Sequence, residues 1–120
     1  MRGKQHLTRK AQFDLVYERG RSWVGKEIVL RAVPNGLEAS RYGLAVSRRV
    51  GKAVVRNRIK RRLREILRQT ALRPGWDIVF IARAPAAQTD YTGLGQSVRD
   101  LLSRAGLFMG EHEGISPGAN

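Results

Sequence analysis

Residues 53–70, AVVRNRIKRRLREILRQT, carry the strongest structural pattern in the chain. Apolar side chains recur there at helical spacing, which predicts one amphipathic helix whose apolar stripe packs on a core. The stripe consists of Val55, Ile59, Leu63, Ile66 and Leu67. The adjoining face is almost entirely basic, and it carries Arg56, Asn57, Lys60, Arg61, Arg64 and Arg68. A helix that concentrates like charge in this way favours an anionic partner.

The charge of the whole chain is concentrated around this helix. The chain has 23 Lys and Arg against 10 Asp and Glu, a net charge of +13. Residues 41–68 hold eleven of the cations and a single acid, Glu65, so this segment alone carries +10. Such a concentration is typical of a surface that binds a polyanion. Arg dominates over Lys, and its guanidinium fork meets phosphate oxygens in pairs. Nucleic acid is therefore favoured over two alternatives, a solvated surface and a membrane-surface or calmodulin-type helix.

The remaining elements predict an α+β fold. The first helix follows Thr8, its expected N-cap, and stops at Gly20. Strands are expected at 22–33, 41–47 and 76–84 from their apolar patterns. A last helix is expected at 91–105 from helical apolar spacing. The order α-β-β-α-β-α, or α-β-β-β-α-β-α with one sheet strand split, predicts helices packed on a small mixed sheet.

Length and composition predict one domain. A chain of 120 residues is about one domain long. We expect a single α/β domain that binds nucleic acid over residues 1–107 and a disordered tail over 108–120. The sequence has no apolar signal-peptide core and no apolar run of membrane-spanning length, so we expect a cytoplasmic protein without membrane association.

Catalytic side-chain patterns are missing from the sequence. There is no cysteine, which excludes disulfides, thiolate zinc sites and cysteine nucleophiles. The two histidines, His6 and His112, lie near opposite ends of the chain. No glycine-rich phosphate loop, Ser/His/Asp set or metal-ligand spacing is present. We therefore predict no catalytic residue and no metal ligand in this chain.

The aromatic residues of the first helix allow two interpretations. Phe13 and Tyr17 share one helix face with Val16. They are either core residues or a platform on which single-stranded bases stack. Tyr42, on the second predicted strand, would line the same surface. Periodicity alone leaves both interpretations open.

The basic helix also carries a family signature. Arg56, Asn57, Lys60, Arg61 and Arg64 match the pattern R-N-x-x-K-R-x-x-R position for position, and SRRVGKAV (47–54) and FDLVY (13–17) match flanking features. Over residues 5–107 the chain resembles the protein subunit of bacterial ribonuclease P. The resemblance implies an α/β sandwich like a ribosomal-protein domain, with a left-handed β-α-β crossover around the basic helix.

The resemblance also implies a function. Family members bind a catalytic RNA and assist the endonucleolytic removal of the 5′ leader from precursor tRNA. The RNA carries the active site with its Mg²⁺ ions, so no cofactor is expected on the protein alone. We expect a monomer, with one protein for each ribonuclease P RNA. The rival hypotheses are a general RNA-binding or ribosome-associated protein and a self-sufficient nuclease.

The expected site residues, carried over from the family only in part, fall into two sets. The set expected to contact the catalytic RNA is Arg48, Arg49, Lys52, Arg56, Asn57, Arg58, Lys60, Arg61, Arg64 and Arg68. The set expected to contact the precursor leader is Phe13, Tyr17, Tyr42, Lys26 and Arg31.

Overall fold

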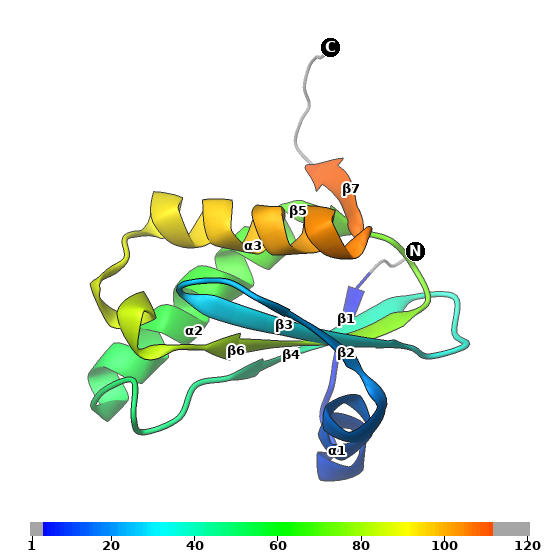
Figure 1. Cartoon of the computed structure of the whole chain (residues 1–120), viewed down its shortest axis with the longest axis horizontal. Helices are drawn as coiled ribbons and strands as arrows, with labels where there is room; N and C mark the ends of the chain where they lie inside the picture. The colour runs from blue at the N-terminus through cyan, green and yellow to red at the C-terminus, as the bar shows by residue number, and fades with distance from the viewer. Residues whose placement is uncertain (1–3, 112–120) are drawn as a thin grey trace.

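The structure, a computed structural model, describes residues 4–111 (Figure 1). Its main sheet has five strands in the order β1-β4-β6-β3-β2, and β5 and β7 form a separate two-stranded sheet. The elements are β1 (Lys4–His6), α1 (Lys10–Arg19), β2 (Arg21–Val24), β3 (Ile28–Pro34), β4 (Ser40–Ala45), α2 (Ala53–Arg68), β5 (Thr70–Leu72), β6 (Trp76–Ala82), the 3-10 helix η1 (Ala84–Gln88), α3 (Tyr91–Ala105) and β7 (Phe108–Glu111).

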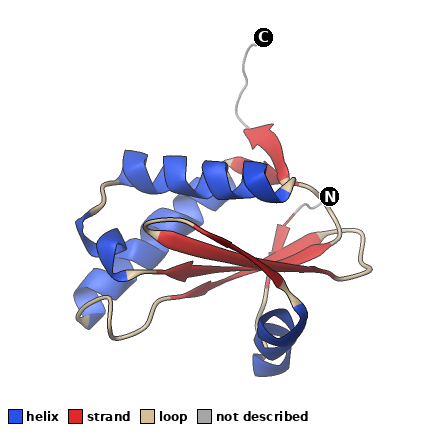
Figure 2. Cartoon of the chain, in the orientation of Figure 1, coloured by secondary structure: helices blue, strands red, loops and turns tan. Residues whose placement is uncertain are grey.

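The helices lie on both faces of the main sheet, as Figure 2 shows. Helices α2 and α3 cover one face, and their apolar stripes meet Ile28, Leu30 and Phe80 in the larger core. Helix α1 covers the other face, where Val16 packs with Leu7 and Val79 in a smaller cluster. The predicted α+β sandwich is therefore confirmed. Among the helices of residues 4–111, none combines the length and apolar character needed to cross a bilayer.

A parallel crossover places the basic helix beside the sheet. Strands β4 and β6 are parallel neighbours, and the chain between them runs through α2 and β5. The β-α-β unit that the family resemblance implied is thus present. Strand β1 adds to the other side of β4, also in parallel, with His6 opposite Tyr42. The remaining pairings, β2 with β3 and β3 with β6, are antiparallel.

The predicted elements differ from the observed ones in several places. The strand at 22–33 is split into β2 and β3. One of the two predicted orders has a split strand but does not specify which strand it is. Strands β1, β5 and β7 were not predicted, because three or four residues are too few for an alternating pattern. Helix α1 is capped by Arg9 instead of Thr8. The side chain of Gln12 accepts hydrogen bonds from the backbone N–H groups of both residues, at 2.8 and 3.0 Å.

The predicted tail is partly wrong. Residues 108–111 form β7, which pairs antiparallel with β5, so the folded unit extends beyond residue 107. A short turn at Gly106, in the left-handed conformation with φ 77°, ends α3 and directs the chain into that strand. The rest of the predicted tail, 112–120, lies outside the described residues.

Candidate nucleic-acid interface

Helix α2 presents its cations on two opposite flanks of a buried stripe. Ile59, Leu63 and Leu67 are fully buried against the sheet and α3. At 100° per residue, Lys60 and Arg64 fall on one side of that stripe, the near flank, while Arg58 and Arg62 fall on the other side, the far flank. The two flanks therefore face different parts of the molecule.

A basic loop before α2 extends the charged surface. Arg48, Arg49 and Lys52 are exposed in this loop. Hydrogen bonds hold its turn, because the backbone N–H of Gly51 donates to the Arg48 carbonyl at 3.2 Å. The Nε of Arg56 in turn donates to the Gly51 carbonyl at 3.0 Å. These bonds join loop and helix into one continuous cationic surface.

The solvent-facing side of α2 continues this surface. Asn57, Arg61, Arg64 and Arg68 are exposed there. Glu65 is the one acid on the helix, and its carboxylate accepts a hydrogen bond of 2.5 Å from Arg68 Nη2. That bond, with a smaller contribution from the nearby positive charge, lowers the pKa of Glu65 below its usual value.

The far flank of α2 contacts protein. Arg62 Nη1 donates to the Thr89 carbonyl at 3.1 Å, and Arg58 Nη2 lies 3.4 Å from the Ala87 carbonyl. Both side chains are half-buried, and the Nε of Arg58 is buried without a hydrogen-bond partner in the structure. The structure thus places Arg58 against η1, apart from the other cations predicted to contact the catalytic RNA.

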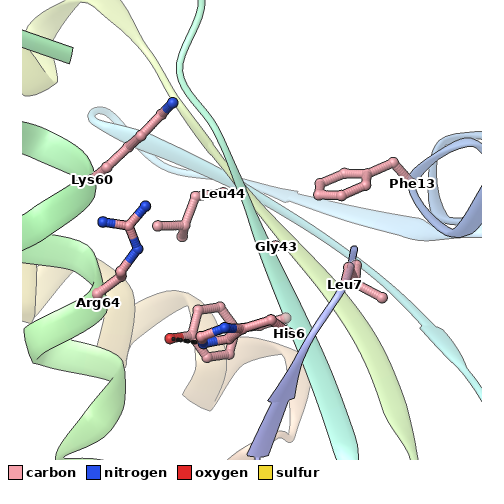
Figure 3. A pocket seen from close by; sticks show the side chains of 8 residues that line it. His6, Leu7, Phe13, Gly43, Leu44, Lys60 and Arg64 are labelled. Carbon is pink, nitrogen blue, oxygen red and sulfur yellow. Dashed lines mark hydrogen bonds between the residues drawn. The ribbon is translucent and has the colours of Figure 1, made fainter. Parts of the chain in front are cut away.

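A pocket of about 200 Å³ opens beside the near flank of α2 (Figure 3). Strand β1 ends opposite Tyr42, and the pocket lies over the next residues of β4, Gly43 and Leu44. Side chains from β1, α1 and α2 surround it. Its lining residues are His6, Leu7, Phe13, Tyr42, Gly43, Leu44, Lys60 and Arg64.

Only two of the five predicted leader contacts line this pocket, Phe13 and Tyr42. Tyr17 is 40% exposed outside it. Arg31 is occupied with protein, because its guanidinium donates to the carbonyls of Tyr17 and Gly20 at 2.6 and 2.9 Å. Lys26 is exposed in the turn between β2 and β3. The structure does not bring these three residues together with the pocket.

Sequence reasoning missed half of the pocket. His6, Leu7, Gly43 and Leu44 were not predicted as site residues, and Lys60 and Arg64 were assigned to the catalytic RNA alone. Alternating residues of β4 face opposite sides of the sheet, so the sequence places the small residue Gly43 on the face opposite Tyr42. This pattern could have indicated that Gly43 leaves room for another side chain. For His6 no local signal existed, because β1 becomes a strand only by pairing with β4.

Gly43 makes room for the aromatic wall of the pocket. A Cβ atom at this position would overlap the Cζ atom of Phe13, so the ring lies directly over bare backbone. The half-buried Phe13 also packs on the cluster of Leu7, Val16 and Val79. Phe13 therefore packs in the core and also lines the pocket. The two interpretations of its helix face, core residue and stacking platform, are compatible for this residue.

Tyr42 lines the pocket and is 6% exposed. Its hydroxyl lies 3.0 Å from His6 Nε2, and the two rings meet edge to face with centroids 4.8 Å apart. Burial raises the pKa of Tyr42, and the positive charge of Arg64 opposes that shift. The tyrosine therefore stays neutral at physiological pH.

The groups that line the pocket suit the binding of a nucleic acid. The pocket joins rings, apolar walls and two cations, and no carboxylate is among its lining residues. Across residues 4–111, no three His, Cys, Asp or Glu side chains gather closely enough to hold a metal ion. Cations beside exposed rings suit a phosphate backbone with unpaired bases.

Comparison with known proteins identifies the family. The family model described as Ribonuclease P matches residues 1–106. A ribonuclease P protein component of Dehalococcoides mccartyi is 45% identical over 120 residues, which cover 100% of both chains. Another, from Caldanaerobacter subterraneus subsp. tengcongensis, is 41% identical over 90% of this chain and 96% of its own length.

Solved structures agree with the sequence comparison. The RNase P protein of Staphylococcus aureus superposes with a TM-score of 0.77 at 28% identity, covering 90% of this chain and 99% of that one. The RNase P protein of Thermotoga maritima gives a TM-score of 0.74 at 31% identity, with coverage of 83% and 96%. The chain therefore belongs to the family of ribonuclease P protein components, the protein subunits of ribonuclease P.

Proposed function

We propose that this subunit binds two RNAs on one continuous surface. The catalytic RNA lies on the loop at 47–52 and the solvent-facing side of α2, and the 5′ leader of precursor tRNA enters the pocket over β4. One observation carries the proposal. Lys60 and Arg64 belong both to the cationic helix and to the lining of an aromatic pocket, so phosphate binding and base stacking meet at one place.

Electrostatics supports a polyanionic partner on α2. Within residues 53–68 the single acid is Glu65, and it is already bonded to Arg68. Like charges four residues apart on a helix, such as Lys60 and Arg64, cost about 0.2–0.5 kcal/mol per pair. Phosphate groups relieve that repulsion, and the release of their counterions makes binding steeply salt-dependent.

The pocket suits a single-stranded leader better than a duplex. Unpaired bases can be splayed out and stacked on aromatic side chains, whereas the bases of an RNA helix are not accessible in this way. Phe13 supplies a ring, Leu44 an apolar surface, and Lys60 and Arg64 the phosphate contacts. Mature tRNA lacks the leader, so this pocket provides a preference for the precursor.

We infer that the hydrolytic chemistry belongs to the RNA and its Mg²⁺ ions. The support is the composition of the pocket, whose lining offers no carboxylate to act as general base or metal ligand. The protein positions the leader and adds positive charge near the phosphates. We further infer a monomer, one for each catalytic RNA, that works in the cytoplasm.

The test is cleavage of a 5′-extended precursor tRNA at low Mg²⁺ concentration. Three mixtures are compared: protein alone, bacterial ribonuclease P RNA alone, and both together. We expect leader removal only with both. Cleavage by protein alone would contradict the assignment of the chemistry to RNA. If the protein gave no stimulation and bound unrelated RNAs equally well, it would be a general RNA-binding protein.

A further inference from the structure

Tyr42 cannot itself be the stacking surface of the pocket. It is 6% exposed, and both its ring and its hydroxyl already have partners. Phe80 meets its ring edge to face at a centroid distance of 6.5 Å, and His6 does so at 4.8 Å. The hydroxyl lies 3.0 Å from His6 Nε2. The base-binding role expected of Tyr42 therefore requires a different residue.

His6 has the properties that Tyr42 lacks. Its side chain is exposed, and it lines the pocket from the end of β1. Pairing of β1 with β4 places His6 directly opposite Tyr42, and the contact with Tyr42 holds its ring in one orientation. An exposed ring held in this way loses little side-chain entropy when a base stacks on it.

The size of the pocket limits what it can hold. Its volume of about 200 Å³ is below the roughly 300–1,000 Å³ typical of pockets for drug-sized ligands. One planar base fits this space better than a run of nucleotides. Lys60 and Arg64, on the α2 side of the same pocket, are placed for the phosphate of that nucleotide (Figure 3).

We propose that His6 is the residue on which a single leader nucleotide stacks, and that Tyr42 is a positioning residue that orients the His6 ring. This proposal rests on the proposed function of the pocket as the leader site. It assigns one base of the leader to the end of β1, next to the phosphate contacts of α2.

The test measures equilibrium binding to the chain assembled with bacterial ribonuclease P RNA. The ligands are precursor tRNA, mature tRNA, and a series of precursors with one abasic nucleotide at successive leader positions. We expect His6→Ala to weaken precursor binding on the order of tenfold, the size of one base-stacking contact, and to leave mature tRNA unchanged. His6→Phe should retain most of the affinity because it keeps a ring.

The abasic series identifies the base that His6 contacts. In the unsubstituted complex, one abasic position should lose about as much affinity as His6→Ala does. In the His6→Ala complex that position should no longer matter, because the two changes remove the same contact. Tyr91→Ala, which removes a similarly exposed aromatic residue at the start of α3, is the matched control and should leave the whole series unchanged.

Two different failures are distinguishable. If the unsubstituted complex does not prefer precursor over mature tRNA, the proposed leader site itself is wrong. If it does prefer precursor, and His6→Ala retains both the preference and the abasic profile, only the role of His6 is overturned. A His6→Ala complex that loses affinity for precursor and mature tRNA equally would also overturn that role, because His6 would then support the fold.

Discussion

The two flanks of α2 use the same residue types for different purposes. Lys60 and Arg64 line the pocket over β4, where a nucleic acid can reach them. Arg58 and Arg62, on the opposite flank, approach backbone carbonyls of η1 and its C-cap Thr89. A single run of cations in the sequence therefore contains both a candidate binding surface and a set of structural contacts.

Helix geometry explains the division. Positions 58 and 60 are two residues apart, which rotates their side chains by about 200° around the helix. Positions 58 and 62 are four apart, as are 60 and 64, so each pair shares a flank. The pairs are matched in spacing and charge, and each can serve as the control for the other.

Replacing the near flank should have the largest effect on RNA binding. For Lys60→Ala with Arg64→Ala we expect at least a tenfold loss in the affinity of precursor tRNA for the complex of protein and catalytic RNA, because charged hydrogen bonds contribute about 1.5–3 kcal/mol each. The slope of log affinity against log salt should flatten by about 1.4–1.8 for two lost phosphate contacts. Binding titrations at several salt concentrations measure both quantities, and an unchanged slope would contradict the assignment of this flank.

Replacing the far flank should affect stability instead. For Arg58→Ala with Arg62→Ala we expect the free energy of unfolding to fall by about 1–3 kcal/mol, because the carbonyls of Ala87 and Thr89 lose their donors. This double variant removes two positive charges, as the near-flank variant does. Any difference between the two variants is therefore due to the position of the charges on α2. Denaturant unfolding gives the stability, and a salt slope that fell as much as for the near flank would remove the distinction.

Gly43→Ala tests how the pocket wall is built. The added methyl group would overlap Phe13, and overpacking of this kind costs about 1–3 kcal/mol. We expect a loss of precursor binding with little change in catalytic-RNA binding, since α2 does not move. Phe13→Ala in the Gly43→Ala background should recover part of the lost stability, because it removes the clash. If the two substitutions lowered the free energy of unfolding additively, the contact between Phe13 and residue 43 would be unimportant.

The smallest effect should come from the solvent-facing side of α2. The pKa of Glu65 is lowered in the folded protein, chiefly by the hydrogen bond from Arg68. The pair therefore stabilises the fold above the ordinary pKa of 4.5, and this stabilisation is lost as pH falls through the lowered value. Between pH 5 and 3 the melting temperature should fall slightly less in Glu65→Gln than in the unsubstituted protein. If Glu65→Gln changed stability more than Arg58→Ala with Arg62→Ala does, the solvent-facing side of α2 would not have the smallest effect.

Most of the secondary structure was predictable because its signals are local. The apolar stripes of α2 and α3 and the continuous apolar run of β6 each identify their element within one segment of sequence. Strands β1, β5 and β7 have three or four residues each and exist through pairing with distant segments. For the same reason β7 falls within the segment predicted to be a disordered tail.

The candidate site was predictable only in part. The sequence by itself determined that α2 is a strongly basic amphipathic helix, because charge and periodicity are properties of consecutive residues. Only the tertiary structure decided which cations remain available, since the carbonyls that occupy Arg58 and Arg62 come from residues 27–29 positions away in the chain. The pocket likewise exists only because β1, α1 and α2 meet around β4, and His6 enters it by pairing with a strand 36 residues away.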